Sequence, residues 1–280
     1  MLDLLPAEQG GCNLELRSQF YERKGSGHTY YGLGWRMKHL EFYEIVKEQM
    51  ERQFQEEKEN INKAAEYCAN SIQNERLVHV FGCGHSQMFA MEVFYRAGGL
   101  LPVNALLIPH LSLFPKAKLS TYGERIEGFS DKYLQQVNTS PLDTMIIVSI
   151  SGRNAGVVDM ALEAKRIGMK VIALTSKEFT SHVSSRHSSG KKLCDVADLV
   201  IDIKCVLGDA CLEMPEIQGK FTGTSTILGM LVMDCITSRT VEICVENGYK
   251  PPLYVSSNLD DGDEANQKQI KKYQSLIDCL

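Results

Sequence analysis

The feature that most constrains the fold is an alternation of short apolar segments with helical patterns between residues 77 and 204. Helical patterns cover Ser86–Arg96 and Ala155–Ile167, and Gly168 ends the second one. The apolar segments read as buried strands; they are Leu77–Gly82, PVNALLI, Thr144–Ile150, KVIALTS and LVIDIK. Apolar strands that alternate with helices of about ten residues predict an α/β fold with a parallel sheet covered on both faces.

The segments before and after this alternation differ in character. Residues 1–36 contain repeated glycines and no sustained apolar period, so we expect a poorly ordered extension and a single domain over 37–280. From His39 to Asn74, apolar residues recur every three or four positions, which predicts one long amphipathic helix or two in succession. This region could pack on its own domain or form a dimer seam. Thr222–Ile243 predicts a long, mostly buried helix.

Charge and apolar content exclude several classes of protein. Thirty Lys and Arg residues stand against 35 Asp and Glu, a net charge of -5, and no large basic face is visible, so nucleic acid is not an expected partner. The longest apolar run, TILGMLVMDCI, is far shorter than the roughly 20 residues of a membrane span. The 9 cysteines are scattered and form no CxxC pair, and the N-terminus carries no hydrophobic leader. We therefore expect a cytoplasmic protein.

Two glycine- and serine-containing turns follow predicted strands. In an open parallel sheet, ligands bind beyond the carboxyl ends of the strands, where the strand order reverses. The first turn, in VHVFGCGHS, brings Gly82, Gly84 and Ser86 to the start of a helix; the second lies in IIVSISGRNAG. Glycines allow close backbone approach, and free amides at a helix start favour an anion. Together the turns predict a phosphate site; each alone could equally be a tight turn with Ser as the helix cap.

Other site classes find no support in the sequence. GCGHSQ lacks the third glycine of a dinucleotide fingerprint, and GxxxxGK[ST] is absent, so no nucleotide cofactor is expected. There is no Cys/His grouping of the usual zinc spacing, and no GxSxG elbow of a hydrolase.

Three stretches together resemble a known family. GCGHS with its helix, SISGRNAGVVDMALEAKRIGMKVIALTS and DVADLVIDI are similar to the sugar isomerase (SIS) domain, the phosphosugar-binding module of aldose-ketose isomerases, MurNAc-6-phosphate etherases and bacterial regulators. EMPEIQGKFTGTSTILGMLVMDCI and PPLYVSSNLDDGDEAN resemble a subgroup of single-domain phosphosugar isomerases. The resemblance implies a flavodoxin-like α/β/α sandwich with a five-stranded parallel sheet, preceded by a long helix. It also implies a homodimer or homotetramer in which partner residues complete each site.

The resemblance and the turns together define candidate phosphate ligands. Carried over from the family, Ser86, Ser149, Ser151, Thr224 and Ser225 would hold the sugar phosphate, although helix capping is an equal alternative for the last pair. The full set of candidates is Gly84, His85, Ser86, Ser149, Ser151, Gly152, Arg153, Asn154, Thr224 and Ser225.

Aldose-ketose isomerisation also needs a base that moves a proton between adjacent carbons. Only a carboxylate desolvated in the cleft has a suitable pKa, and the candidates are Glu213, favoured, and Glu92, with His110 as a group that could face the same cleft. Some family members use a late histidine, but none follows His187 here. The acidic tail could reach a partner's site, bind a hard cation or simply be solvated; it comprises Asn258, Asp260, Asp261, Asp263 and Glu264.

The leading hypothesis is a phosphosugar isomerase that acts by carboxylate-mediated proton transfer without a metal. The missing late histidine favours a second reading, a non-catalytic phosphosugar sensor. An etherase acting on a lactyl-amino-sugar phosphate is the third.

Overall fold

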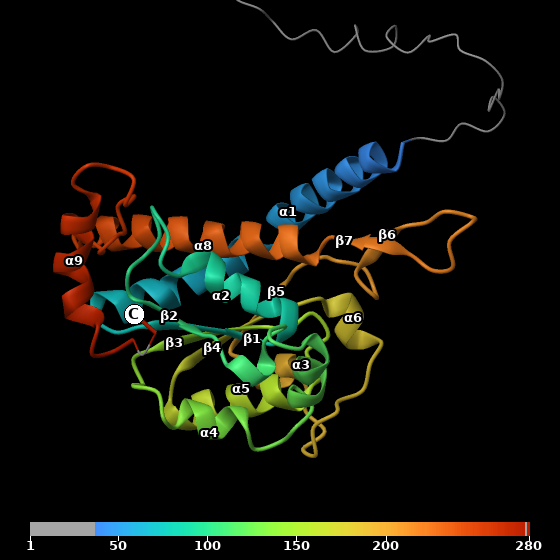
Figure 1. The fold of residues 1–280 in the computed structure, drawn as a ribbon, viewed down its shortest axis with the longest axis horizontal. Coiled ribbons are helices and arrows are strands. Elements are labelled where there is room, and N and C mark those ends of the chain that lie inside the picture. The colour runs from blue at the N-terminus through green and yellow to red at the C-terminus, as the bar shows by residue number, and fades with distance from the viewer. Residues whose placement is uncertain (1–36, 278) are drawn as a thin grey trace, which may run out of the picture. The chain divides into compact units, whose positions relative to one another are not determined.

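A five-stranded parallel sheet forms the centre of the protein (Figure 1). The computed structural model describes residues 37–277, 279 and 280, so the prediction for residues 1–36 lies outside the described part. The strands are β1 (Val78–Gly82), β2 (Val103–Leu106), β3 (Thr144–Val148), β4 (Lys170–Thr175) and β5 (Leu199–Asp202). Their order, β2-β1-β3-β4-β5 with every neighbour parallel, is the flavodoxin-like order. The predicted α/β class is confirmed.

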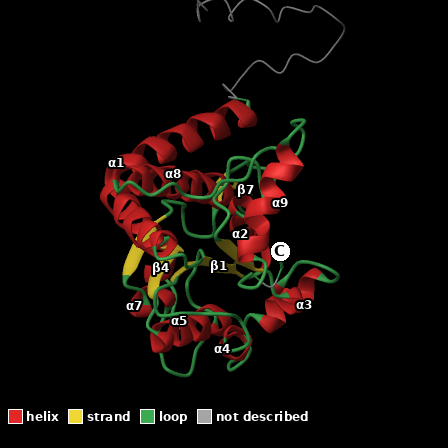
Figure 2. Ribbon diagram, turned by 90° about the vertical axis from the view of Figure 1, so that its left-hand side faces the viewer, coloured by secondary structure: helices red, strands yellow, loops and turns green. Residues whose placement is uncertain are grey.

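Helices cover both faces of this sheet, as Figures 1 and 2 show. Strand residues alternate between the faces: Ile146 and Val148 belong to one core cluster, Met145 and Ile147 to the other. The first face is covered by α1 (Lys38–Gln73), α2 (Gln87–Val93) and α8 (Ser225–Glu246). The second is covered by α4 (Ser130–Leu134), α5 (Ala155–Ile167) and α7 (Leu193–Val196). The result is the three-layer α/β/α sandwich that was predicted.

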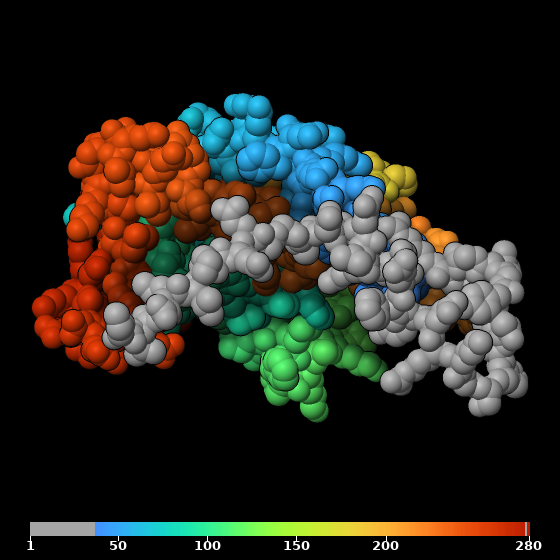
Figure 3. Space-filling model, turned by 90° about the horizontal axis from the view of Figure 1, so that it is seen from above, coloured from blue at the N-terminus to red at the C-terminus, as the bar shows by residue number. Residues whose placement is uncertain are grey.

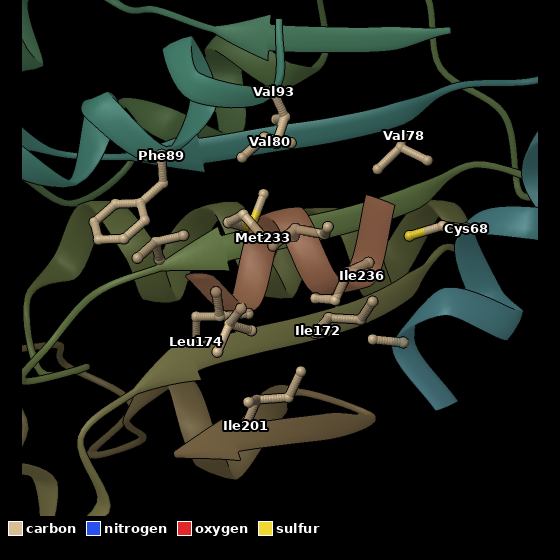
Figure 4. Close-up of a cluster of buried hydrophobic side chains, with 14 of the residues drawn as sticks. Cys68, Val78, Val80, Phe89, Val93, Ile172, Leu174, Ile201, Met233 and Ile236 are labelled. Atoms are coloured by element: carbon tan, nitrogen blue, oxygen red, sulfur yellow. The ribbon is translucent and has the colours of Figure 1, made fainter. Parts of the chain in front are cut away.

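The close contact of α2 with α8 depends on one glycine. Phe89 of α2 and Met233 of α8 belong to the same buried cluster against the sheet, shown in Figure 4. A Cβ added to Gly229 of α8 would run into the ring of Phe89. The absent side chain therefore lets the two helices come together over β1 and β3.

The long helix α1 packs on its own domain. It lies beside α8 in Figure 3, and its buried side chains include Ile61, Ala64 and Cys68. Buried ion pairs tie it to the edge of the sheet, because Lys204 Nζ lies 3.1 Å from Glu57 and 3.0 Å from Asp202. Its first half and the preceding Met37 still expose large apolar side chains; those in the helix are Leu40, Tyr43 and Phe54.

Two helix boundaries differ from the prediction. The helix expected over Ser86–Arg96 begins as a 3₁₀ turn and ends at Val93, because Phe94 is extended and packs beside the buried cluster of Leu77 and Leu101. The late helix begins at Ser225, not Thr222, because an unpredicted antiparallel hairpin of β6 (Ala210–Leu212) and β7 (Phe221–Gly223) takes up the preceding residues.

The C-terminal segment holds a helix that the sequence did not suggest. α9 (Gly262–Tyr273) lies in the acidic tail, and its Tyr273 is buried beside Leu77 and Leu101. The remaining short elements are η2 (Gly84–Ser86), η3 (Pro109–Leu111), α3 (Ala117–Gly123) and α6 (Lys177–Ser181). Within the described ranges, no helix combines the length and apolar character that crossing a bilayer requires.

Candidate functional site

Both predicted turns lie at the point where the strand order reverses. After β1, the chain forms β2 on one side of β1 and then β3 on its other side. The strand order therefore reverses between β1 and β3. Gly82, the last residue of β1, is paired with Val148, the last residue of β3. The two turns therefore start side by side at the carboxyl edge of the sheet.

The first turn is shaped by two glycines. A Cβ on Gly82 would lie 2.4 Å from the carbonyl oxygen of Ser86, so only glycine lets the chain fold back there. Gly84 has a φ of 58°, a left-handed conformation that suits glycine. A Cβ at this position would lie next to the hydroxyl of Ser120 on α3. Ser86 is half-buried at the start of α2, whereas His85 is exposed.

The second turn has its carbonyl groups held by the rest of the chain. The carbonyl of Ile150 accepts from Ser176 N at 3.0 Å, and that of Ser151 accepts from Thr180 Oγ1 at 3.2 Å. In the same way, Leu193 N donates to Gly152 O at 2.8 Å, and Arg186 N donates to Arg153 O at 2.9 Å.

These bonds leave the donors of the second turn available. Among the described residues, the backbone amides of Ser151, Arg153 and Asn154 have no hydrogen-bond partner. Gly152 has a φ of 60°, which reverses the chain at this point, and its amide donates to Ser149 Oγ at 3.2 Å. The three free amides, beside two serine hydroxyls and at the start of α5, are suited to binding an anion.

Glu124 adds a partly buried carboxyl group to this edge of the sheet. It follows α3 directly, and its carbonyl accepts from Gly156 N of α5 at 2.9 Å. Burial raises the pKa of the Glu124 carboxyl, although a hydrogen bond from the side chain of Asn154 and the charge of Arg125 oppose the rise. Its negative charge also acts on the Cys83 thiol in the first turn, so the carboxyl group lies near both turns. A partly buried carboxyl group with a raised pKa beside a candidate anion site is suited to proton transfer.

The sequence analysis missed Glu124. It stands in a polar stretch without a clear helical period, and the only local signal is its position after Gly123, at the end of a short helix.

The predicted bases lie in other surroundings. Glu213 is on the β6–β7 hairpin, its side chain is 67% exposed, and it pairs with Lys220 at 3.1 Å. Its own chain does not desolvate it, so a role as base requires burial by another molecule. Glu92 of α2 forms an ion pair with Arg96, which lies beyond the end of that helix. His110 is exposed in η3, with its ring 6.2 Å from that of Phe129.

The head of α8 is occupied by a carboxylate from its own chain. Asp209 Oδ1 accepts from Thr224 N at 3.0 Å and from Ser225 N at 2.8 Å, and Asp209 Oδ2 accepts from Ser225 Oγ at 2.6 Å. The Thr224 hydroxyl is buried without a hydrogen-bond partner among the described residues. A phosphate on Thr224 or Ser225 would therefore compete with Asp209.

The acidic tail does not assemble a cation site in this part of the chain. The described residues contain no group of three or more His, Cys, Asp or Glu side chains arranged to hold a metal ion. Asp263 and Glu264 instead lie in the first turn of α9, where negative charge favours the helix.

Comparison with known proteins agrees with this fold. A model of the SIS domain matches residues 41–176, which include β1, β3 and both turns, so the resemblance to SIS-domain proteins is confirmed. Two solved structures are similar. Phosphoheptose isomerase from Neisseria gonorrhoeae has a TM-score of 0.49 and 15% identity, covering 73% of this chain and 97% of that one. The sugar isomerase domain of an RpiR transcription factor from Sphaerobacter thermophilus has a TM-score of 0.43 and 17% identity, covering 85% and 98%.

Two full-length relatives define the family more narrowly. A UPF0309 protein from Geobacillus kaustophilus is 38% identical over 240 residues, which cover 86% of this chain and 96% of the relative. A UPF0309 protein from Thermoanaerobacter pseudethanolicus is 40% identical over 245 residues, which cover 86% and 99%. The chain belongs to the UPF0309 family.

Proposed function

We propose that the two turns at the carboxyl ends of β1 and β3 bind the phosphate of a sugar phosphate and that the protein interconverts the aldose and ketose forms of that sugar. The observation that carries this proposal is the second turn, whose carbonyls are bound by the chain while the amides of Ser151, Arg153 and Asn154 stay free. The hydroxyls of Ser149 and Ser151 add two donors, and the SIS-domain match supports a phosphosugar as the ligand.

Glu124 replaces Glu213 as the favoured base. The carboxylate would remove the proton from C2 of the open-chain aldose and return it to C1, while the hydroxyl proton on O2 moves to O1 through an enediol. A raised pKa favours both the uptake and the return of a proton near neutral pH. Glu92, Glu213 and His110 stay as second candidates, with Glu213 dependent on a partner that buries it.

The test is proton NMR in D₂O with aldose and ketose 6-phosphates and their N-acetylamino relatives. Loss of the C2 or C1 proton signal together with appearance of the isomer would establish the reaction. We expect Ser151→Ala to weaken binding, and Glu124→Gln to keep binding but lose proton exchange. Glu246→Gln, at the exposed end of α8, is the matched control and should exchange at the normal rate. Normal exchange by Glu124→Gln would remove the assignment of the base.

A phosphosugar sensor is the second candidate, favoured by the absence of any histidine after His187. Binding of one of these sugars without proton exchange would support it. Release of the lactyl ether from MurNAc 6-phosphate would instead support the etherase reading.

The proposal includes a homo-oligomer. The exposed apolar residues Leu40, Tyr43 and Phe54 lie along the first half of α1, with Met37 directly before it, and such exposed apolar residues are typical of a contact surface. Sedimentation of the full chain should give a dimer or tetramer, and a monomer would contradict shared sites.

A further inference from the structure

The described arginines fall into two groups. Five of them pair with a carboxylate within 4.0 Å, and these are Arg52, Arg76, Arg96, Arg166 and Arg239. Arg125, Arg153 and Arg186 have no such partner among the described residues. All three lie around the second turn, although they come from separate segments: the residues just after α3, the turn itself and the loop before α7.

Arg125, Arg153 and Arg186 form an arginine cluster, and two of its members make side-chain hydrogen bonds in or beside the turn. Arg186 Nη1 donates to Asn154 Oδ1 at 3.0 Å, and Arg153 Nη2 reaches Ser184 Oγ at 3.4 Å. Arg125 follows Glu124, which shares the side chain of Asn154 with Arg186. The cluster therefore borders the proposed phosphate site on the side of α5.

The loop that carries Arg186 is anchored in place. His187 Nε2 lies 2.9 Å from Asp159 Oδ1 of α5, and Ser188 N donates to Glu127 at 2.6 Å. Lys192 Nζ donates to the carbonyl of Thr180 at 2.7 Å. These bonds hold the loop near the turn, and none of them involves the guanidinium group of Arg186.

The cluster carries more positive charge than its surroundings balance. Arg153 Nε is buried without a hydrogen-bond partner among the described residues. Burial lowers the pKa of the Arg186 guanidinium, and the charges of Arg153 and Arg125 lower it further. Only Glu124 acts in the opposite direction. Guanidinium groups with unused donors are suited to carboxylate or phosphate oxygens, because their planar fork matches either group.

We infer that the sugar phosphate bound by this protein carries a second anionic group, a carboxylate or a second phosphate, which the arginine cluster holds beside the turn. The inference rests on the proposed function. The turn already offers one phosphate three amides and two hydroxyls, so three further cationic side chains exceed what that phosphate needs. The substrate class is thus a sugar-acid phosphate or a sugar bisphosphate.

Matched ligand pairs test this by calorimetric titration of the full chain at low salt. The first pair is glucitol 6-phosphate and 6-phosphogluconate, which differ only in a carboxylate at C1. The second is fructose 6-phosphate and fructose 1,6-bisphosphate, and the third is GlcNAc 6-phosphate and MurNAc 6-phosphate. We expect at least one doubly acidic ligand to bind about tenfold or more tightly than its match, as charged hydrogen bonds allow. The pair that shows the preference distinguishes carboxylate from phosphate.

Two variants locate the preference. Arg125→Gln should reduce it about tenfold while leaving the affinity for the singly charged match unchanged. Arg52→Gln, on the exposed face of α1, is the control and should keep the full preference. Equal binding of both members of every pair would overturn the inference and leave the proposed function intact. Equal weakening of both members by Arg125→Gln would also overturn it, because the arginine would then serve the first phosphate. Failure of all six ligands to bind would count against the proposed function itself.

Discussion

Replacing Asp143 with asparagine tests how the amino-terminal end of the sheet is held together. Asp143 directly precedes β3 and is 1% exposed. Arg76 donates to both of its oxygens, at 2.9 and 3.0 Å, and Leu77 N donates at 3.0 Å. His79 Nε2 lies at 3.2 Å and Ser140 N at 2.6 Å from Oδ2. One buried carboxylate thus accepts from both the start of β1 and the loop before β3.

The expected loss of stability follows from this set of donors. Removing one partner of a buried ion pair costs about 3–5 kcal/mol. Asparagine keeps the shape and one acceptor, but its amide group must face at least one N–H donor, at a cost of about 1–3 kcal/mol. Arg76 is 18% exposed, so water can partly hydrate its charge. We therefore expect Asp143→Asn to lower the free energy of unfolding by about 3 kcal/mol.

The same carboxylate predicts a pH dependence. Burial alone would raise the pKa of Asp143, but hydrogen bonds from His79 and Arg76 outweigh burial, so the pKa in the folded state is lowered. A lowered pKa stabilises the fold above the unfolded value of about 3.9, and this contribution is lost as the pH falls through the folded value. The difference between the natural protein and Asp143→Asn should hold from pH 7 to about pH 4 and shrink below it.

Urea unfolding at pH 7 and at a series of lower pH values measures both effects. Asp234→Asn, on the exposed side of α8, is the control and should change the free energy of unfolding by less than about 0.5 kcal/mol. Equal urea midpoints for Asp143→Asn and the natural protein at pH 7 would refute the argument. A difference in the free energy of unfolding that does not shrink in strong acid would also refute it.

Three further substitutions test the packing and the turns. Gly229→Ala should lower the free energy of unfolding by about 2 kcal/mol, because the methyl group meets the ring of Phe89; an unchanged melting temperature would contradict this contact. Asp209→Ala should cost about 1–2 kcal/mol in urea unfolding, because the amides at the head of α8 lose their cap, and Asp209→Asn should restore part of it. Gly152→Ala, at a φ of 60°, should cost about 1–2 kcal/mol and weaken binding of fructose 6-phosphate; calorimetry showing normal affinity would disprove a role for the turn.

The central sheet was predictable because parallel strands are buried on both faces. KVIALT and TMIIV are nearly continuous apolar runs, and such runs can be recognised without knowledge of their neighbours. Helix α9 could not be recognised in the same way. Its sequence is polar, and its position depends on Tyr273, which is buried against Leu77 and Leu101 from a distant part of the chain.

The site residues show the same difference between features that are local in the sequence and features that depend on tertiary contacts. The second turn was predictable because its shape is local: Gly152 reverses the chain between two serines and the start of a helix. Glu124 and Asp209 were not, because the raised pKa of the first and the capping role of the second arise only from tertiary contacts. Glu213 shows the converse, since a promising position in the sequence proved to be an exposed hairpin residue.

The two ends of β1 and β3 have different roles. The Asp143 network binds the amino ends of β1 and β3, whereas both turns leave their carboxyl ends. Each strand is 5 residues long, which places about 16 Å between network and turns. Substitutions separated by more than about 10 Å act nearly independently. A less stable Asp143→Asn protein, studied well below its unfolding temperature, should therefore bind a phosphosugar with unchanged affinity, and a parallel loss of both properties would show that the strands transmit strain between their ends.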